Sequence, residues 1–229
     1  MYTLYIANKN YSSWSLRPWV LMRILGIGFD EKLCVFGEGS NQERFRVFSP
    51  SGRVPCLHDG DIVVWDSLAI AEYLAERHSG VWPDDARARA WARSAAAEMH
   101  SSFSALRSSC AMNCGVRVRL RELSPGLRAD LARLEALWSD GLERFGGDWL
   151  AGASFSAVDA FFAPVAFRIQ AYGLELGNPA ARYAERLLAL PAMREWYDAA
   201  LLEPWRARAH EAALQASTTV LEDLRVPEQ

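Results

Sequence analysis

The spacing of apolar residues changes once along this chain, near Gly80, and no other feature constrains the fold as strongly. Before that point, short runs of alternating apolar residues, typical of strands, are interleaved with helical stretches. After it, apolar residues recur only at helical spacing. Glycine, proline and two aspartates interrupt both patterns in residues 79–86, which are predicted to be a linker. The sequence therefore predicts two domains, an α/β unit over 1–78 and an all-helical unit over 87–229.

The first domain is expected to be a small mixed sheet covered by helices. Asp59-Gly60-Asp61 lies between two apolar runs, which is a strong signal for a hairpin turn. Ser67 precedes an apolar helical face and is expected to be its N-cap. The expected elements are a strand over 2–7, a helix over 15–26, a strand over 30–36, a hairpin over 53–66 and a helix over 67–78.

The second domain is expected to contain helices only, with no strand beyond residue 90. A short turn should follow Pro204, and the last dozen residues should be frayed. The fold class is thus an α/β domain followed by an all-α domain. The expected helices cover 85–109, 124–146, 156–172, 179–189 and 191–202.

The composition of the 229 residues is that of a globular protein without a nucleic-acid partner. Hydrophobic residues make up 51% and charged residues 23%, and the net charge of -3 indicates no dominant basic stripe. No apolar run reaches the length of a membrane span, and the N-terminus has no signal-peptide pattern. A cytoplasmic protein with no membrane partner is therefore expected.

The four cysteines, Cys34, Cys56, Cys110 and Cys114, include no CxxC pair, and the histidines do not cluster with them. This spacing argues against a zinc site, so no metal is expected. Cys110 and Cys114 are four residues apart and could share one helix face. Reduced, buried thiols are the favoured interpretation, because free cysteine is often a small core residue.

Two short motifs, Val54-Pro55 and Asp66-Ser67, each allow a structural role and a binding role. Pro55 should begin a strand, and the dipeptide alone favours the trans form. A cis bond would turn the polar backbone groups of Val54 outward, where an extended peptide could pair with them. Ser67 could simply cap its helix, or could bind a carboxylate together with free backbone N–H groups. Asp66 could order the turn or accept a ligand ammonium group.

Ser12 and Ser13 stand in NYSSWSLRPW, at the expected start of the first helix. No GxSxG motif surrounds them, and none of the four histidines is an obvious base for a serine nucleophile. A hydroxyl at a helix N-terminus can instead donate a hydrogen bond to a ligand thiolate, which the helix dipole also favours. The alternative is that the two serines only start the helix.

Four motifs together resemble the glutathione S-transferase family and occur in its order. They are a strand followed by SSWSLR on a helix, SGRVP, DSLAIAEYL, and WLAGASFSAVDAFFAPV over 149–165. In the last motif, Ser156 and Asp159 have the spacing of a capping box. The resemblance covers nearly the whole chain and implies a thioredoxin-like N-terminal domain with an all-helical C-terminal domain. The SSWS motif of this chain is most similar to that of serine-type bacterial members, notably the zeta class, although Trp14 stands where that class has a cysteine.

The resemblance also implies that the chain binds glutathione as a cosubstrate. Val54 would pair with the cysteinyl backbone of glutathione, with Pro55 in the cis form. Asp66 and Ser67 would take the γ-glutamyl end. Arg53, just before Val54, would reach the glycyl carboxylate.

An enzyme that activates the glutathione thiol for attack on an apolar electrophile or a hydroperoxide is the implied function. Ser12 is the implied donor to the sulfur, with Ser13 as the alternate. The implied partners are a small electrophile and a second copy of the chain in a homodimer. A maleylacetoacetate isomerase-like enzyme and a non-catalytic glutathione-binding interaction protein are the alternatives. The wall of the electrophile pocket is expected to contain Trp14, Leu106, Cys110, Met112 and Asn113.

Overall fold

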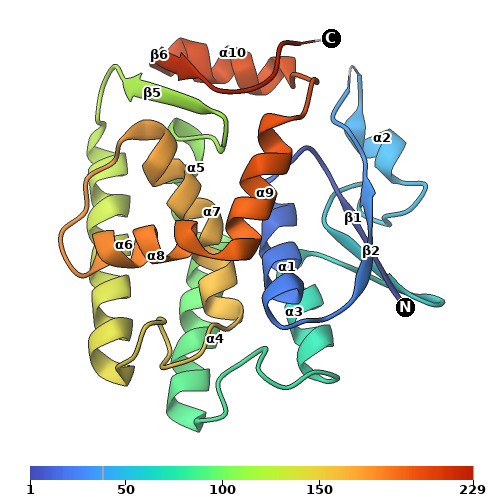
Figure 1. Ribbon diagram of the computed structural model, residues 1–229, viewed down its shortest axis with the longest axis vertical. Coiled ribbons are helices and arrows are strands. Elements are labelled where there is room, and N and C mark those ends of the chain that lie inside the picture. The colour runs from blue at the N-terminus through green and yellow to red at the C-terminus, as the bar shows by residue number, and fades with distance from the viewer. Residues whose placement is uncertain (38, 229) are drawn as a thin grey trace.

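A four-stranded mixed sheet forms the first part of the chain in the computed structural model, which describes residues 1–37 and 39–228 (Figure 1). Its elements are β1 (Tyr2–Ile6), α1 (Ser13–Ile24), β2 (Phe29–Leu33), α2 (Asn41–Phe45), β3 (Cys56–Asp59), β4 (Ile62–Trp65) and α3 (Ser67–Ala75). The strand order is β2-β1-β3-β4, with β1 parallel to β2 and the other pairs antiparallel. Helices α1 and α3 lie between the sheet and the rest of the chain (Figure 1). The predicted α/β domain is confirmed, and α2 is an addition within the expected loop.

The hairpin predicted from Asp59-Gly60-Asp61 is also present. Strands β3 and β4 pair with Asp59 opposite Ile62. Gly60 has a φ of 62°, in the left-handed region that favours a residue without a side chain. The turn therefore depends on its glycine, and the register that it sets brings the end of β4 to the start of α3.

Helices make up most of the rest of the described chain. They are α4 (Ala86–Ser101), α5 (Ser104–Ser109), α6 (Pro125–Phe145), α7 (Ala157–Tyr172), α8 (Ala180–Ala189), α9 (Pro191–Leu201) and α10 (Arg208–Ser217). Helix α7 is buried along most of its length and packs against α1, α4 and α8, as expected of a helix that is apolar on all sides. The helical C-terminal domain is confirmed, while its boundary at residue 87 stays a prediction. Among the described residues, no helix combines the length and apolarity that a membrane crossing requires.

Two strands also lie in this second part, so the expectation of helices only beyond residue 90 is wrong. Strand β5 (Val116–Leu120) pairs antiparallel with β6 (Thr218–Asp223), beside α10 (Figure 1). In β5, the buried Val116 and Val118 alternate with arginines, which is the period of a strand. The partner strand lies far along the chain, so no local hairpin signal marks either segment. The last dozen residues, expected to be frayed, contain β6, and α10 lies where only a short turn was expected.

The single helix expected over 85–109 is broken into α4 and α5. Phe103, between them, has a φ of 58°, which is uncommon for a residue with a side chain. Its ring is buried in the core, at 3% exposed, and this packing stabilises the unusual backbone. The break therefore depends on tertiary contacts and gives α5 a direction of its own.

Asp159 is the centre of a buried polar cluster at the start of α7. Its carboxylate accepts hydrogen bonds from the backbone N–H of Ser156 at 2.9 Å, the backbone N–H of Leu150 at 3.1 Å and the Tyr183 hydroxyl at 2.8 Å. The bond from Ser156 is the acidic half of the predicted capping box. Burial raises the pKa of Asp159 to about 6, against the opposing effect of these donors.

Candidate active site

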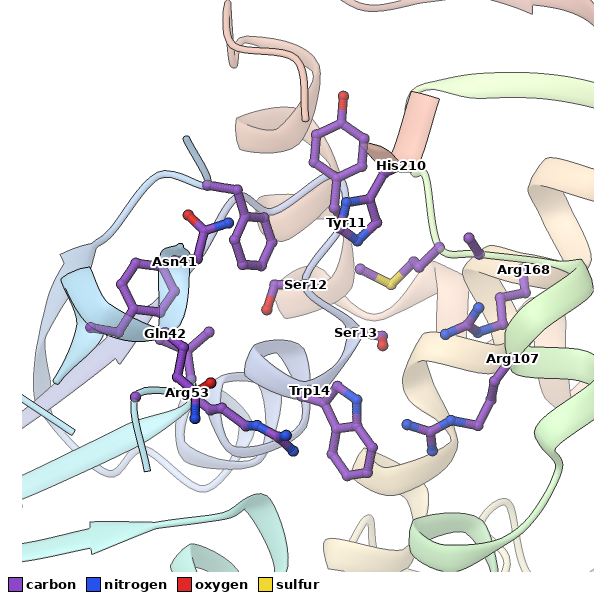
Figure 2. A pocket seen from close by; sticks show the side chains of 16 residues that line it. Tyr11, Ser12, Ser13, Trp14, Asn41, Gln42, Arg53, Arg107, Arg168 and His210 are labelled. Carbon is purple, nitrogen blue, oxygen red and sulfur yellow. The ribbon is translucent and has the colours of Figure 1, made fainter. Parts of the chain in front are cut away.

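A cavity of about 380 Å³ opens between the α/β domain and the helical domain (Figure 2). The start of α1, α2 and the loop before β3 line one side, while α5, α7 and α10 contribute to the other. A second cavity, of about 540 Å³, extends from it along the loop before β3 to the N-terminus of α3. Trp14, Gln42, Arg53 and Val54 line both, so one ligand could enter the two cavities together.

Ser12 and Ser13 both line the first cavity (Figure 2). Ser12 is the N-cap residue of α1 and is 5% exposed, and its Oγ lies 2.7 Å from the Oγ of Ser15. The Ser15 Oγ accepts a hydrogen bond from the backbone N–H of Ala7 at 3.3 Å. Either hydroxyl of this pair can be the donor. When the fully buried Ser15 donates to the Ser12 oxygen, the proton of Ser12 is available to a ligand.

The Val54–Pro55 peptide bond is cis, as the family resemblance implies and contrary to the trans form that the dipeptide alone favours. Val54 lies where the two cavities meet, next to Arg53, whose side chain is exposed. Pro55 is buried just before β3, where its missing N–H costs no ladder hydrogen bond.

Asp66 and Ser67 line the second cavity at the N-terminus of α3. The N-cap is Asp66 rather than the expected Ser67, because an Asp66 carboxylate oxygen accepts from the Leu68 N–H at 2.8 Å. The other carboxylate oxygen lies 3.3 Å from Nε2 of His100. Ser67 is the buried first residue of the helix, and its hydroxyl accepts from the Arg17 guanidinium at 3.3 Å. A carboxylate, a hydroxyl and helix N–H groups thus surround one end of the cavity.

Trp14 and Met112 line the first cavity, as expected for its electrophile wall. Leu106 and Cys110 are instead fully buried in the hydrophobic core. Asn113 is 3% exposed and donates a hydrogen bond to a carboxylate of α10 at 3.1 Å. We therefore place these three residues behind the cavity rather than in its wall. Because the chain breaks before α5, the side chains of α5 point in other directions than they would in one continuous helix over 85–109.

The indole of Trp14 is held between two guanidinium groups. The Cζ atoms of Arg17 and Arg107 each lie 4.1 Å from the centre of its ring, a distance at which cation–π attraction operates. Arg17 is 2% exposed, and this burial is the main reason that its pKa lies well below the ordinary arginine value. Burial also lowers the pKa of Arg107. The indole is thus fixed at the boundary between the cavities.

Among the lining residues that the sequence did not predict are three basic side chains, those of Arg107, Arg168 and His210. Arg168 is 4% exposed and is one of two charged residues in the apolar helix α7, which was an available signal. Burial lowers the pKa of Arg168 to about 10, and the charge of Arg107 adds to this effect. His210 belongs to α10, where no helix was expected, and its ring stacks on Phe36 with centroids 5.6 Å apart.

The fold and the paired cavities define a thioredoxin-like domain joined to a helical domain, with a site between them. The family model for the glutathione S-transferase N-terminal domain matches residues 11–77, and that for the C-terminal domain matches 118–199. Together these matches cover more than half of the chain. The chain belongs to the glutathione S-transferase family. Its closeness to the zeta class stays a prediction.

Individual relatives and solved structures similar to this chain also belong to this family by name. Glutathione S-transferase 1 from Dianthus caryophyllus is 27% identical over 184 residues, which are 76% of this chain and 80% of the relative. Among solved structures, glutathione S-transferase unclassified 2 from Bombyx mori has a TM-score of 0.67 at 22% identity and covers 94% of this chain and 98% of its own. A glutathione transferase homologue from Burkholderia, solved with bound glutathione, has a TM-score of 0.65 at 23% identity, with coverages of 87% and 97%. The structural matches show a shared fold.

Proposed function

We propose that this protein is a cytoplasmic glutathione-dependent transferase that activates the glutathione thiol for attack on an electrophile. The proposal rests above all on the Ser12 hydroxyl, which lines the first cavity and keeps its own proton for a ligand when Ser15 donates to its oxygen. Ser12 lies at the N-terminus of α1, whose dipole also favours an anion. Membership of the family supports glutathione as the ligand that brings the thiol.

Glutathione would occupy the second cavity, with its two ends held apart from the thiol. The backbone of Val54 would pair with the cysteinyl residue, which would direct the sulfur toward the first cavity. The Ser67 hydroxyl and the free N–H groups of α3 suit the γ-glutamyl carboxylate, and the Asp66 carboxylate suits the ammonium group beside it. Arg53 would meet the glycyl carboxylate.

In the reaction, the bound thiol loses its proton to solvent, and the thiolate sulfur forms a bond to the electrophilic carbon. The leaving group departs with the electron pair of the bond that breaks. A free thiol has a pKa of about 8.5, so only a small fraction is ionised at neutral pH. A hydrogen bond from Ser12 and the N-terminus of α1 both favour the thiolate. Because the serine is a donor rather than the nucleophile, the mechanism requires no neighbouring base.

Calorimetry should detect glutathione binding to the wild-type protein, with affinity roughly ten- to a hundredfold weaker in Ser67→Ala. Hydrogen bonds to charged groups contribute about 1.5–3 kcal/mol, and this variant removes one from the carboxylate site. Ser94→Ala changes an exposed serine of α4 and is the matched control, with unchanged affinity expected. Equal affinity in a folded Ser67→Ala protein would refute this role, and no binding by the wild type would refute the proposed function.

The substrate that the protein turns over with glutathione distinguishes the proposed transferase from an isomerase-like enzyme and from a non-catalytic interaction protein. Conjugation of an electrophile, or reduction of a hydroperoxide by glutathione, would support the transferase. Isomerisation of maleylacetoacetate without net consumption of glutathione would indicate the isomerase-like enzyme, although Trp14 replaces the cysteine of the zeta motif. Glutathione binding without turnover of any acceptor would indicate an interaction protein.

We also propose that the protein is a homodimer with two-fold symmetry, the commonest arrangement of soluble oligomers. Val47, Ile62 and Trp65 of the first domain are exposed at 87%, 43% and 45%, and burying such side chains would favour association. Sedimentation at micromolar concentration should therefore give a species of about twice the chain mass of 25.6 kDa. A single species at the chain mass would contradict the dimer.

A further inference from the structure

The first cavity has an excess of positive charge. Arg53, Arg107 and Arg168 line it, and among the described residues its lining includes no aspartate or glutamate. Figure 2 shows Arg107 and Arg168 on one side of Trp14 and Arg53 on the other. Arg53 is exposed and also lines the second cavity, where glutathione is proposed to lie. Arg107 and Arg168 belong to the helical domain and face the space left for the other substrate.

Arg168 is a buried cation whose donors are only partly satisfied. It is 4% exposed, and one of its terminal nitrogens donates to the backbone oxygen of Cys110. Its Nε is buried and has no hydrogen-bond partner within residues 1–37 and 39–228. An arginine with a pKa of about 10 remains protonated at neutral pH. A buried charge without an opposite charge is costly, so this position favours an anion in the cavity.

Arg107 adds a second guanidinium to the same side. Its terminal nitrogen donates to the backbone oxygen of Met99 at 3.3 Å, and its face lies on the Trp14 indole. Arg107 and Arg168 are close enough that the charge of the first lowers the pKa of the second. An anion between the two groups would relieve this repulsion and accept charge-assisted hydrogen bonds from both.

Acidic side chains near the cavity are engaged elsewhere. Asp66 caps α3 and lies beside His100, and its charge acts on Arg17. Glu211 forms an ion pair with Arg225 at 2.5 Å. The two cavity arginines of the helical domain thus lack a carboxylate of the protein to pair with, within the part of the chain that the structure describes.

We infer that the electrophile taken by this protein is an organic anion, and that Arg107 and Arg168 bind its carboxylate. The inference rests on the proposed function, because it names the class of the second substrate. The sequence predicted an apolar electrophile. The electrophile inferred here has an apolar body, which would contact Trp14 and Met112, and a charged end. Glutathione does not account for the two arginines, because neither lines the second cavity among its described residues.

Two chloromethyl arenes that differ in charge provide the test. With para-(chloromethyl)benzoate, the glutathione thiolate forms a sulfur–carbon bond at the methylene group, and chloride leaves with the electron pair of the carbon–chlorine bond. The carboxylate is unchanged, and the thiol proton passes to the buffer. The neutral para-(chloromethyl)benzamide undergoes the same displacement with a similar shape. The ratio of kcat/KM for the two compounds therefore reports recognition of the charge, corrected for their uncatalysed rates.

Wild-type protein should prefer the benzoate by about ten- to a hundredfold, which is the effect of charged hydrogen bonds. Arg168→Met and Arg107→Met should each lower this ratio at least severalfold. Arg168 is buried, and its replacement could prevent folding. Arg107 is half-buried, so Arg107→Met still tests the inference in that case. Arg119→Met removes the same charge from an exposed position of β5, and this control should retain the wild-type ratio.

The outcomes separate this inference from the proposed function. Turnover of both compounds at equal kcat/KM would overturn the anionic substrate and leave the transferase intact. An equal fall for both compounds in Arg107→Met, together with weaker glutathione binding by calorimetry, would assign the arginines to glutathione and also overturn the inference. If glutathione does not bind and neither compound reacts, the proposed function itself is wrong.

Discussion

Replacing Ser12 with alanine should raise the pKa of the bound glutathione thiol by about one to two pH units and lower turnover about ten- to a hundredfold. The variant removes a hydrogen bond to the thiolate, and such bonds to charged groups contribute about 1.5–3 kcal/mol. Affinity for glutathione should change little, because Val54 and the N-terminus of α3 hold the ends of the peptide. Thiolate absorbance against pH measures the pKa, and steady-state rates measure the turnover.

Ser13→Ala is the matched control for this prediction, since Ser13 is adjacent and lines the same cavity. Its effect on the thiol pKa should be smaller. Ser15→Ala should shift the pKa in the same direction as Ser12→Ala, because Ser15 orients the Ser12 hydroxyl. A shift in Ser13→Ala without one in Ser12→Ala would show that the other serine is the donor. No shift in either would mean that the two residues only start a helix.

Asp159→Ala should lower the free energy of unfolding by about 3–6 kcal/mol. The substitution leaves two buried N–H groups, of Ser156 and Leu150, and the Tyr183 hydroxyl without their acceptor. Each such loss costs about 1–3 kcal/mol, partly relieved by rearrangement. Chemical denaturation of both proteins measures the difference. Tyr183→Phe removes a single donor and leaves the carboxylate in place, so it should cost about 1 kcal/mol.

The effect of Asp159 should also depend on pH. Its pKa is raised from 3.8 to about 6 in the folded protein, so the folded state binds this proton more tightly than the unfolded state does. Stability contributed by this group therefore falls as pH rises from about 4 to 6, and the difference from Asp159→Ala should shrink over that interval. A variant as stable as the wild type would contradict the role of the cluster.

Local patterns determined most elements of this fold. The hairpin between β3 and β4 was predictable because Gly60 and its two aspartates form a turn signal within three residues. Helix α7 was predictable to within a residue, since its start at Ser156 and Asp159 has a capping pattern. The thioredoxin-like domain and the helical domain follow from the change in apolar spacing near Gly80.

Contacts between distant segments decided what local patterns could not. Strand β5 has only five residues and pairs with β6 from the far end of the chain, so neither strand is evident alone. The left-handed backbone of Phe103 is stabilised by the packing of its ring. The cis form of Val54–Pro55 likewise belongs to its loop rather than to the dipeptide.

For the site, the sequence by itself determined the residues that lie in contiguous motifs. Ser12, Val54 and Ser67, which line the two cavities, were predicted in this way, because each belongs to a short motif. The tertiary structure alone brought Arg107 and Arg168 to one cavity, from helices that are separated in the chain. Whether an arginine is paired depends on which carboxylates fold around it, and spacing along a sequence does not contain that information. The positive charge of the cavity was therefore decided by the fold.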